Sequence, residues 1–345
     1  MHSYFQEVKK ELAARIDSYR QLEEERHLGW QSNEVDQLWR IRNARLETQR
    51  KGPRGPGYEK YHDFYARTLP RIDASVFSRG DKTFLDCGCA PGGLVAFFIK
   101  DLGWSGVGAS LDPENGGLGM RYHPPEDKFR FVNMSFTSQN FDSEMTSLYS
   151  NRVDFLNLGV VIGGHQIEDD ETTSIQTLSV CRNSFLLMFE ALKTGGDLMW
   201  IFSSTSAGAW LYFLDKLRSV FPGGISLFST LVPSRSPVYA LCRGFNPEAG
   251  RLWQAELRQM THPGTDCFDK WNYKTWSEAE EVVSYLRTDL DSVWRKQRDC
   301  LKQIRTDASN LANAPEEAFT KLSGGQNKAI AKSSSRADVD DNWRR

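Results

Sequence analysis

The 345-residue sequence lacks several features that would place it in a special class of proteins. No apolar run approaches the roughly 18 residues that span a membrane, and the first residues are charged, unlike a signal peptide. Six scattered cysteines without C-x-x-C spacing argue against a disulfide framework and a zinc site. A net charge of −2 gives no overall attraction to nucleic acid. We therefore expect a soluble intracellular protein, cytoplasmic or nuclear, without a metal, on which any basic surface is local.

The most informative segment that is present runs from residue 84 to residue 99. Three residues with strand character lead into a turn with three glycines, and an apolar helix follows. Glycine lets the backbone approach a ligand closely, and the first N–H groups of a helix are free to bind a polar group. A tight turn between a strand and a helix can also need glycine for its own geometry, so both interpretations stay open. The turn residues are Asp86, Gly88, Ala90, Pro91, Gly92 and Gly93.

Strand-like and helical segments alternate from Thr83 to Phe245. This alternation predicts an α/β fold with a mainly parallel sheet and helices on both faces. Ligands bind such sheets at the carboxyl ends of the strands, where the first strand delivers the glycine turn. We expect strands at 83–87, 106–111, 130–133, 153–158, 196–203, 225–229 and 238–243, and helices at about 93–102, 172–193 and 207–220.

Helical segments flank this alternating region. Periodic apolar residues predict helices between residues 3 and about 50, before a run of Gly and Pro at 51–57, and another helix at 58–72. An apolar stripe within 271–308 predicts helices that dock on the core, and the residues from 310 onward are expected to be disordered. The predicted division is an N-terminal helical extension and linker (1–57), an α/β domain (58–245), a C-terminal helical region (246–309) and a tail (310–345).

Residues 84–99 resemble the first motif of the FtsJ-like family of S-adenosylmethionine-dependent methyltransferases, which modify ribose 2′-hydroxyls of RNA. That motif is a strand, the pattern Asp-x-Gly-x-Ala-Pro-Gly-Gly and an apolar helix, and the chain matches it almost letter for letter. Weaker similarity extends over about 58–245. The resemblance implies a Rossmann-like methyltransferase fold with a seven-stranded sheet, and S-adenosylmethionine as the cofactor. It places the turn residues around the methionine part of the cofactor and adds Gly159, after the fourth strand, to the cofactor-binding positions.

Departures from the family begin at the second strand. Where the family usually has an acid that holds the adenosine ribose, this chain has Ser110, and Asp112 follows two residues later. Asp112 either takes that role or only opens the turn that follows, and neither interpretation is preferred. Near the adenine, where the family often has another acid, the sequence offers only Asn133 or Ser135.

The family's catalytic tetrad, Lys-Asp-Lys-Glu, has no clear counterpart in this chain. Arginine cannot replace the lysine that deprotonates the ribose hydroxyl, because its pKa is too high. The other three positions carry no group that exchanges a proton near neutral pH. We therefore expect ribose 2′-hydroxyl methylation of the FtsJ type to be absent or very slow. The corresponding residues are Arg67, Gly159, Ile201 and Pro237.

Two functions remain open. A methyltransferase with a rebuilt site would use the polar cluster His165, Asp169, Asp170 and Glu171 after the fourth strand. His165 is the candidate general base, because the ordinary pKa of histidine lies near neutrality, although a loop histidine without chemistry fits equally well. A catalytically degenerate protein would instead bind S-adenosylmethionine, RNA or a partner without methyl transfer.

The substrate is also open. A local basic run near Trp39 could contact RNA phosphates, or it could simply be a solvated helix face. A small-molecule substrate would instead need an apolar pocket, for which Trp200, Trp210 and Tyr212 near the fifth strand are candidates. The basic run consists of Arg40, Arg42, Arg45, Arg50, Lys51 and Arg54.

Overall fold

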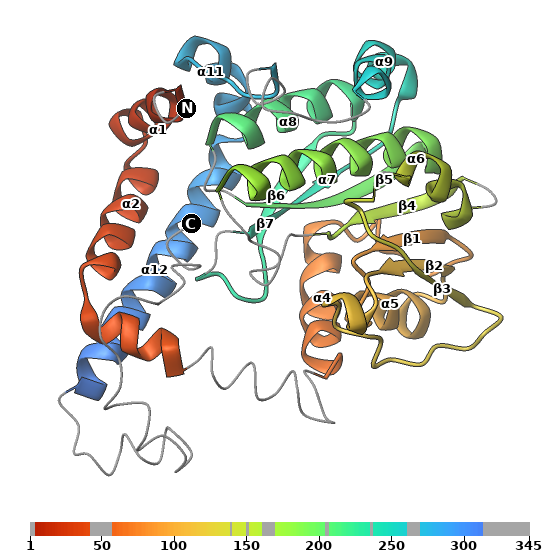
Figure 1. Cartoon of the computed structure of the whole chain (residues 1–345), viewed down its shortest axis with the longest axis horizontal. Helices are drawn as coiled ribbons and strands as arrows, with labels where there is room; N and C mark the ends of the chain where they lie inside the picture. Colours follow the sequence, from red (N-terminus) through yellow and green to blue (C-terminus); the bar gives the residue numbers. More distant parts are fainter. Residues whose placement is uncertain are drawn as a thin grey trace.

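A seven-stranded sheet forms the centre of the molecule (Figure 1). The computed structural model describes residues 4–41, 57–138, 140–149, 152–160, 170–203, 207–234, 237–260 and 270–312. The strand order is β3-β2-β1-β4-β5-β7-β6, and β7 alone runs antiparallel to its two neighbours. The strands are β1 (Thr83–Cys87), β2 (Ser105–Ser110), β3 (Phe129–Asn133), β4 (Val153–Leu158), β5 (Leu192–Ser203), β6 (Ile225–Ser229) and β7 (Pro237–Cys242).

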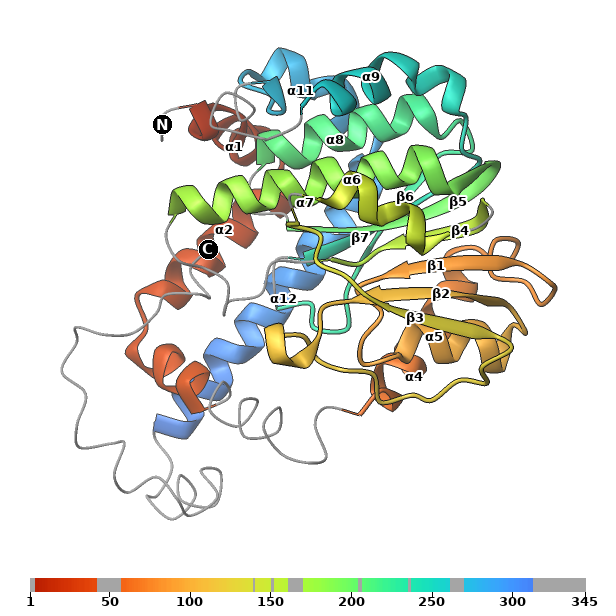
Figure 2. The same ribbon diagram turned by 45° about the vertical axis from the view of Figure 1, so that its right-hand side comes forward.

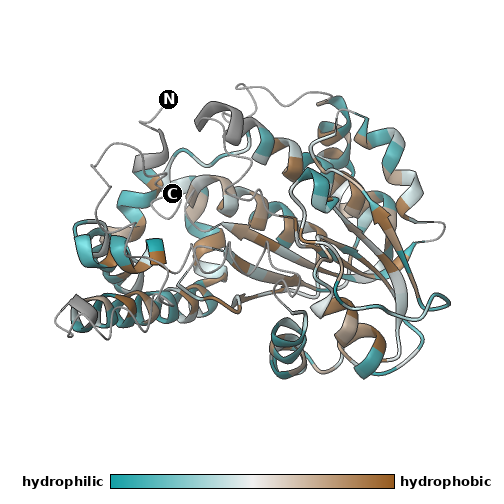
Figure 3. Ribbon diagram, turned by 60° about the horizontal axis from the view of Figure 1, so that its bottom comes forward, coloured by the Kyte–Doolittle hydropathy of each residue, from teal (hydrophilic) through white to brown (hydrophobic). Residues whose placement is uncertain are grey.

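Helices cover both faces of this sheet (Figure 2). Successive residues of a strand point to opposite faces, so Phe84 and Leu85 of β1 belong to two different apolar clusters. One cluster lies under α4 (Glu59–Ile72), α5 (Gly93–Ala96) and the π-helical turn η1 (Phe97–Asp101). The other lies under α6 (Phe141–Glu144), α7 (Asp170–Ala191), α8 (Ala207–Val220) and α9 (Arg251–Gln259). Figure 3 shows apolar residues concentrated in the strands and on the helix faces that meet them.

The predicted fold class is confirmed: the protein has a Rossmann-like, mainly parallel seven-stranded sheet with helices on both faces. Six strands lie within one residue of their expected bounds, whereas β5 begins at Leu192 instead of residue 196. Leu192 pairs with Val153 before a register shift, and Gly195 (φ +80°) provides the irregular backbone between the two parts of β5. The short helix α9 lies within residues 246–309, which were predicted to be a helical region. The short turns η2 (Pro113–Asn115), η3 (Met145–Leu148) and η4 (Pro247–Gly250) complete the described elements of this region.

Helices from the N-terminal and C-terminal parts of the described chain pack against each other. Helices α1 (Tyr4–Arg15) and α2 (Asp17–Trp30) precede the sheet, and α11 (Trp276–Tyr285) and α12 (Arg287–Ala312) follow it. Figure 1 shows α2 and α12 side by side. We call α2, the helical residues 33–41 and α12 the helical arm. The terminal regions that the sequence suggested as separate parts thus form one helical layer, held by the polar pairs Ser18–Asp291, Gln21–Arg298 and Glu25–Arg305.

The C-terminal helices also complete the outer edge of the sheet at β6. The N–H of Ile225 donates to the Tyr285 hydroxyl at 3.1 Å, and the N–H of Leu227 donates to Asp289 Oδ2 at 2.7 Å. An edge strand otherwise presents such N–H groups unpaired to other chains. The apolar stripe predicted to dock on the core does so, since Leu290 and Trp294 are buried. Among the described residues, no helix has both the length and the apolar character needed to cross a membrane.

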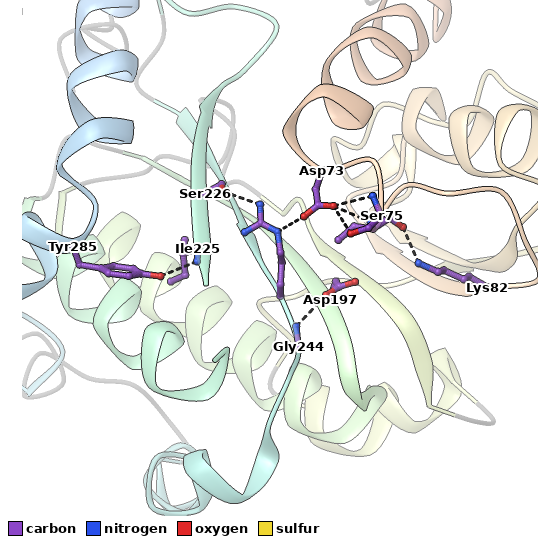
Figure 4. A network of polar contacts seen from close by, with 10 residues as sticks. Asp73, Ser75, Lys82, Asp197, Ile225, Ser226, Gly244 and Tyr285 are labelled. Atoms are coloured by element: carbon purple, nitrogen blue, oxygen red, sulfur yellow. Dashed lines mark hydrogen bonds and ion pairs between the residues drawn. The ribbon is translucent and has the colours of Figure 1, made fainter. Parts of the chain in front are cut away.

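A polar network fastens the amino end of the sheet (Figure 4). The Asp73 carboxylate accepts hydrogen bonds from Ser75 and from Arg243, and the Arg243 guanidinium also donates to Ser226 at 2.8 Å. Hydrogen bonding, first of all from the Ser75 hydroxyl, lowers the pKa of Asp73 to about 2. Asp197 accepts the N–H of Gly244 at 3.0 Å beside this network. These contacts join α4 to β5, β6 and β7 at the edge opposite the glycine turn.

Candidate functional site

The glycine turn is held between the ends of its two neighbouring strands. The N–H of Gly88 donates to the Ala109 carbonyl at 2.7 Å, and the N–H of Gly159 donates to the Cys87 carbonyl at 2.8 Å. Gly88 has a φ of +85°, and a Cβ built on it would lie 2.7 Å from the Gly159 carbonyl oxygen. Gly88 is therefore required for close packing on the end of β4. A larger residue at position 88 would disturb the fold whether or not a ligand binds.

The other two glycines of the turn also serve internal packing. Gly92 has a φ of +107°, and its Cβ would lie 2.9 Å from Cβ of Tyr122. A Cβ on Gly93 would lie 2.4 Å from Cβ of Tyr61, because α4 crosses α5 closely at this point. Gly92 and Gly93 are buried, whereas Gly88 and Ala90 keep part of their surface exposed. A ligand would therefore meet the turn at its first half.

Asp86 is a buried carboxyl group whose hydrogen bonding is incomplete. Asp86 is only 1% exposed, and its Oδ1 accepts a hydrogen bond from Asn157 Nδ2 at 2.7 Å. Oδ2 has no partner among the described residues, and neither has Asn157 Oδ1. Burial raises the pKa of Asp86 to about 7, and no basic side chain of the described part offsets it. An unpaired buried carboxyl is costly, so Asp86 is the strongest candidate to receive a hydrogen-bond donor from a ligand.

The ends of β2 and β3 place four predicted site residues at the same edge. Ser110 lies opposite Asn133 in the sheet register. Asp112 Oδ1 accepts the N–H of Glu114 at 2.8 Å and so opens η2, as one of the two interpretations had it. Asp112 Oδ2 also accepts from Asn133 Nδ2 at 3.1 Å, which leaves an exposed amide–carboxylate pair. Ser135 lies just beyond β3 and hydrogen-bonds Thr137 at 3.0 Å.

One contact group near the turn was not expected from the sequence. Lys100 Nζ donates to the Tyr58 hydroxyl at 3.0 Å and lies 4.6 Å from the centre of the Tyr122 ring. The Pro91 carbonyl accepts the N–H of Tyr122 at 3.3 Å. This group fixes the segment after η2 over the glycine turn. Its members come from three separate elements, so no local pattern in the sequence marks them.

Three of the four tetrad positions meet at the carboxyl edge of the sheet. Leu158 pairs with Trp200, so the next residues, Gly159 and Ile201, lie side by side. Pro237 is paired with Ser203 on the adjoining strands. Arg67 does not join them, because its side chain is 73% exposed and ion-paired with Asp63 on α4.

A pair of tyrosines fills the space beside these positions. Tyr239 on β7 lies opposite Ile201, and its hydroxyl is 2.7 Å from the hydroxyl of Tyr65 on α4. Burial raises the pKa of Tyr239 to about 12 and the pKa of Tyr65 well above its usual value. Both hydroxyls therefore keep their protons at neutral pH. Neither tyrosine can serve as the general base that the tetrad lysine would have supplied.

Several sequence-based hypotheses fall on residues outside the described part of the chain. His165 and Asp169 are outside the described residues, and the side chains of Asp170 and Glu171 are not described either. Of the basic run, only Arg40 is described, at the end of the helical residues 33–41; Arg42, Arg45, Arg50, Lys51 and Arg54 lie outside. In the described ranges, no group of three or more His, Cys, Asp or Glu side chains could hold a metal ion.

The aromatic pocket suggested for a small molecule is wrong. Trp200 and Trp210 are 5% and 3% exposed, and both stack on Phe202, at 4.8 and 5.6 Å between ring centres. Tyr212 is also buried and packs edge-on against Phe213. These rings fill the core between β5 and the helices α7 and α8, because the apolar residues of β5 that face this side need a partner layer.

Of the three comparisons with known proteins, only the comparison with solved structures finds similar proteins. No protein-family model matches the chain, and no curated protein matches it. A putative ribosomal RNA methyltransferase from Plasmodium falciparum is 19% identical, covering 52% of this chain and 96% of its own, with a TM-score of 0.35. The N-methyltransferase NodS from Bradyrhizobium japonicum is 15% identical over 54% of this chain and 97% of its own, with a TM-score of 0.35. Human methyltransferase-like protein 13, in complex with SAH, is 13% identical over 59% and 91%, with a TM-score of 0.33.

Proposed function

We propose that this chain binds S-adenosylmethionine at the carboxyl end of β1 and acts on RNA without the lysine-based ribose chemistry of FtsJ-like enzymes. The observation that carries the proposal is Asp86, a buried carboxyl with a free oxygen next to a turn that matches the family motif. A globular protein rarely keeps such a group without a use for it, since burying it unpaired costs stability.

The residues present fit the cofactor as follows. Asp86 Oδ2 would accept a hydrogen bond from the ammonium of the methionine part, next to the exposed half of the turn at Gly88 and Ala90. Ser110 and the exposed Asp112–Asn133 pair would hold the ribose hydroxyls. Ser135, just beyond β3, would contact the adenine. When bound, the cofactor supplies an activated methyl group.

The proposed departure from ribose chemistry rests on the tyrosine pair and the tetrad positions. A ribose hydroxyl must lose its proton during methylation, and a positioned base contributes about 10²–10⁴-fold to such a step. Gly159, Ile201 and the Tyr65–Tyr239 pair offer none near neutral pH. His165 remains the predicted base of a rebuilt site.

Radiolabelled S-adenosylmethionine, incubated with the folded protein and total cellular RNA, tests the reaction. We expect no appreciable 2′-O-methylribose in nuclease digests. Transfer to another atom, lost in His165→Ala, would support the rebuilt site. Robust 2′-O-methylation would overturn the proposed chemistry.

A second candidate is a protein that binds S-adenosylmethionine or RNA without methyl transfer. The buried tyrosine pair favours it, because the hydroxyls beside the tetrad positions keep their protons near neutral pH. Cofactor binding with no labelled RNA of any kind would support this candidate.

A further inference from the structure

The helical arm rises from the same edge of the sheet that carries the candidate cofactor site. Ile225 of β6 contacts Tyr285, and Leu227, two residues later, contacts Asp289. The chain therefore runs from α11 into α12 alongside β6 and in the same direction as β6. β6 ends at Ser229, only about 7 Å farther on at strand rise. α12 continues from Asp289 to Ala312, or about 35 Å at helical rise. The arm therefore projects well past the carboxyl edge, as Figures 1 and 2 show.

This projecting part is held rigidly. Arg305 forms an ion pair with Glu25 at 3.1 Å, and Arg298 bonds Gln21, so α2 accompanies α12 beyond the sheet. At the far end, the side chains that pack together are Val35, Leu38, Ile304 and Ala308. A buried apolar contact at the tip and polar pairs along the seam fix the arm relative to the edge.

The projecting part of α12 carries unbalanced positive charge. Arg298 is paired with Asp299 at 2.6 Å, which uses the one acid on the exposed face between residues 295 and 306. Arg295, Lys296 and Lys302 are exposed, and none of them is ion-paired with an acid of the described residues. Arg295 and Lys302 are seven residues apart, two helical turns or about 10 Å, and so lie on one stripe.

We propose that Arg295, Lys296 and Lys302 form a phosphate-binding face on the arm that holds an RNA strand while its reactive nucleotide reaches the carboxyl edge of the sheet. This inference rests on the proposed function in taking RNA as the substrate. Lysine and arginine heads at a spacing of about 10 Å reach phosphates about three nucleotides apart in a stacked strand. The arm places these exposed cations beside the carboxyl edge of the sheet.

Fluorescence anisotropy with a labelled, unstructured RNA of about 20 nucleotides, at several salt concentrations, tests the inference. The arm variant combines Arg295→Ala, Lys296→Ala and Lys302→Ala. The control variant combines Arg71→Ala, Arg79→Ala and Lys270→Ala, three exposed basic residues outside the arm. Circular dichroism checks that both variants fold, and each protein is also titrated with S-adenosylmethionine.

We expect the arm variant to bind RNA at least tenfold more weakly at low salt. Its slope of log affinity against log salt should be smaller by about 2, since each single-strand phosphate contact contributes about 0.7. Unchanged affinity and slope in the arm variant, or an equal loss in the control, would overturn the inference. Failure of the unmodified protein to bind RNA while it binds S-adenosylmethionine would also overturn it and leave the cofactor proposal standing. RNA binding through the arm without cofactor binding would support the inference and overturn the cofactor proposal.

Discussion

The hydroxyl of Tyr65 lies 2.7 Å from the hydroxyl of Tyr239, and Tyr239 is paired across the sheet with Ile201, one of the four positions compared with the FtsJ-like tetrad. The pair joins α4 to β7 on the face of the sheet that α4 and α5 cover. Burial keeps both groups protonated, because it raises the pKa of each phenol. The hydrogen bond between the two hydroxyls therefore holds α4 against β7 beside the compared positions.

This structural role predicts a pattern of stability in phenylalanine variants. Tyr239→Phe should lower the free energy of unfolding by about 1–3 kcal/mol, because the Tyr65 hydroxyl then stays buried without a partner. The double variant Tyr65→Phe with Tyr239→Phe should lose less than the sum of the two single variants. Urea unfolding monitored by fluorescence measures all three. Additive losses would contradict a direct bond between the two hydroxyls.

Asp86 predicts how stability changes with pH. Its pKa is about 7 in the folded protein and about 3.9 when unfolded. Folding therefore favours the protonated carboxyl, and its contribution is fully present below pH 4 and is lost as the pH rises to about 7. The loss is at most about 4 kcal/mol. Asp86→Asn should be more stable than the unmodified protein at pH 8 and similar to it near pH 4, in urea unfolding at both pH values. Parallel pH profiles for the two proteins would show that Asp86 is ionised normally.

The contact between Asp289 and the outer edge of β6 predicts how substitutions at Asp289 change the free energy of unfolding. Asp289→Ala should lower the free energy of unfolding by about 1–2 kcal/mol, because the Leu227 N–H loses its acceptor. Asp289→Asn keeps an acceptor oxygen of the same size and should cost less. Thermal unfolding compares the two. Light scattering on a chain shortened before α11 should show association, since the uncovered β6 edge can then pair with other chains; a monomeric shortened chain would contradict this.

The strands of the sheet could be predicted from the sequence because they are short apolar runs bounded by turn residues. The structure forms strands at those runs. Residue identity alone also gave the site predicted around Asp86 and the predicted absence of an FtsJ-like tetrad, and both stay predictions. Long-range packing was not visible. Tyr65 and Tyr239 are 174 residues apart, and Arg305 and Glu25 are 280 apart, so no spacing relates them.

Gly88 shows the same limit in another form. From the sequence, its lack of a side chain could serve a ligand or a tight turn, and only the contact with Gly159 shows that packing requires it. Likewise, the aromatic residues around β5 were compatible with a pocket until the helices α7 and α8 were placed against them. Periodicity indicates which residues are buried but does not distinguish a core from a cavity.

Calorimetric titration with S-adenosylmethionine tests the central claim most directly, that Asp86 holds this cofactor. Asp197→Asn is the matched control, because Asp197 is another aspartate whose pKa is raised by burial and it lies at the opposite edge of the sheet. We predict that the unmodified protein and Asp197→Asn bind the cofactor, with affinity that increases from about pH 5.5 to 7.5 as Asp86 ionises. Asp86→Asn should bind at least tenfold more weakly and without that pH dependence. No binding by the folded unmodified protein, or equal binding by Asp86→Asn, would contradict the account.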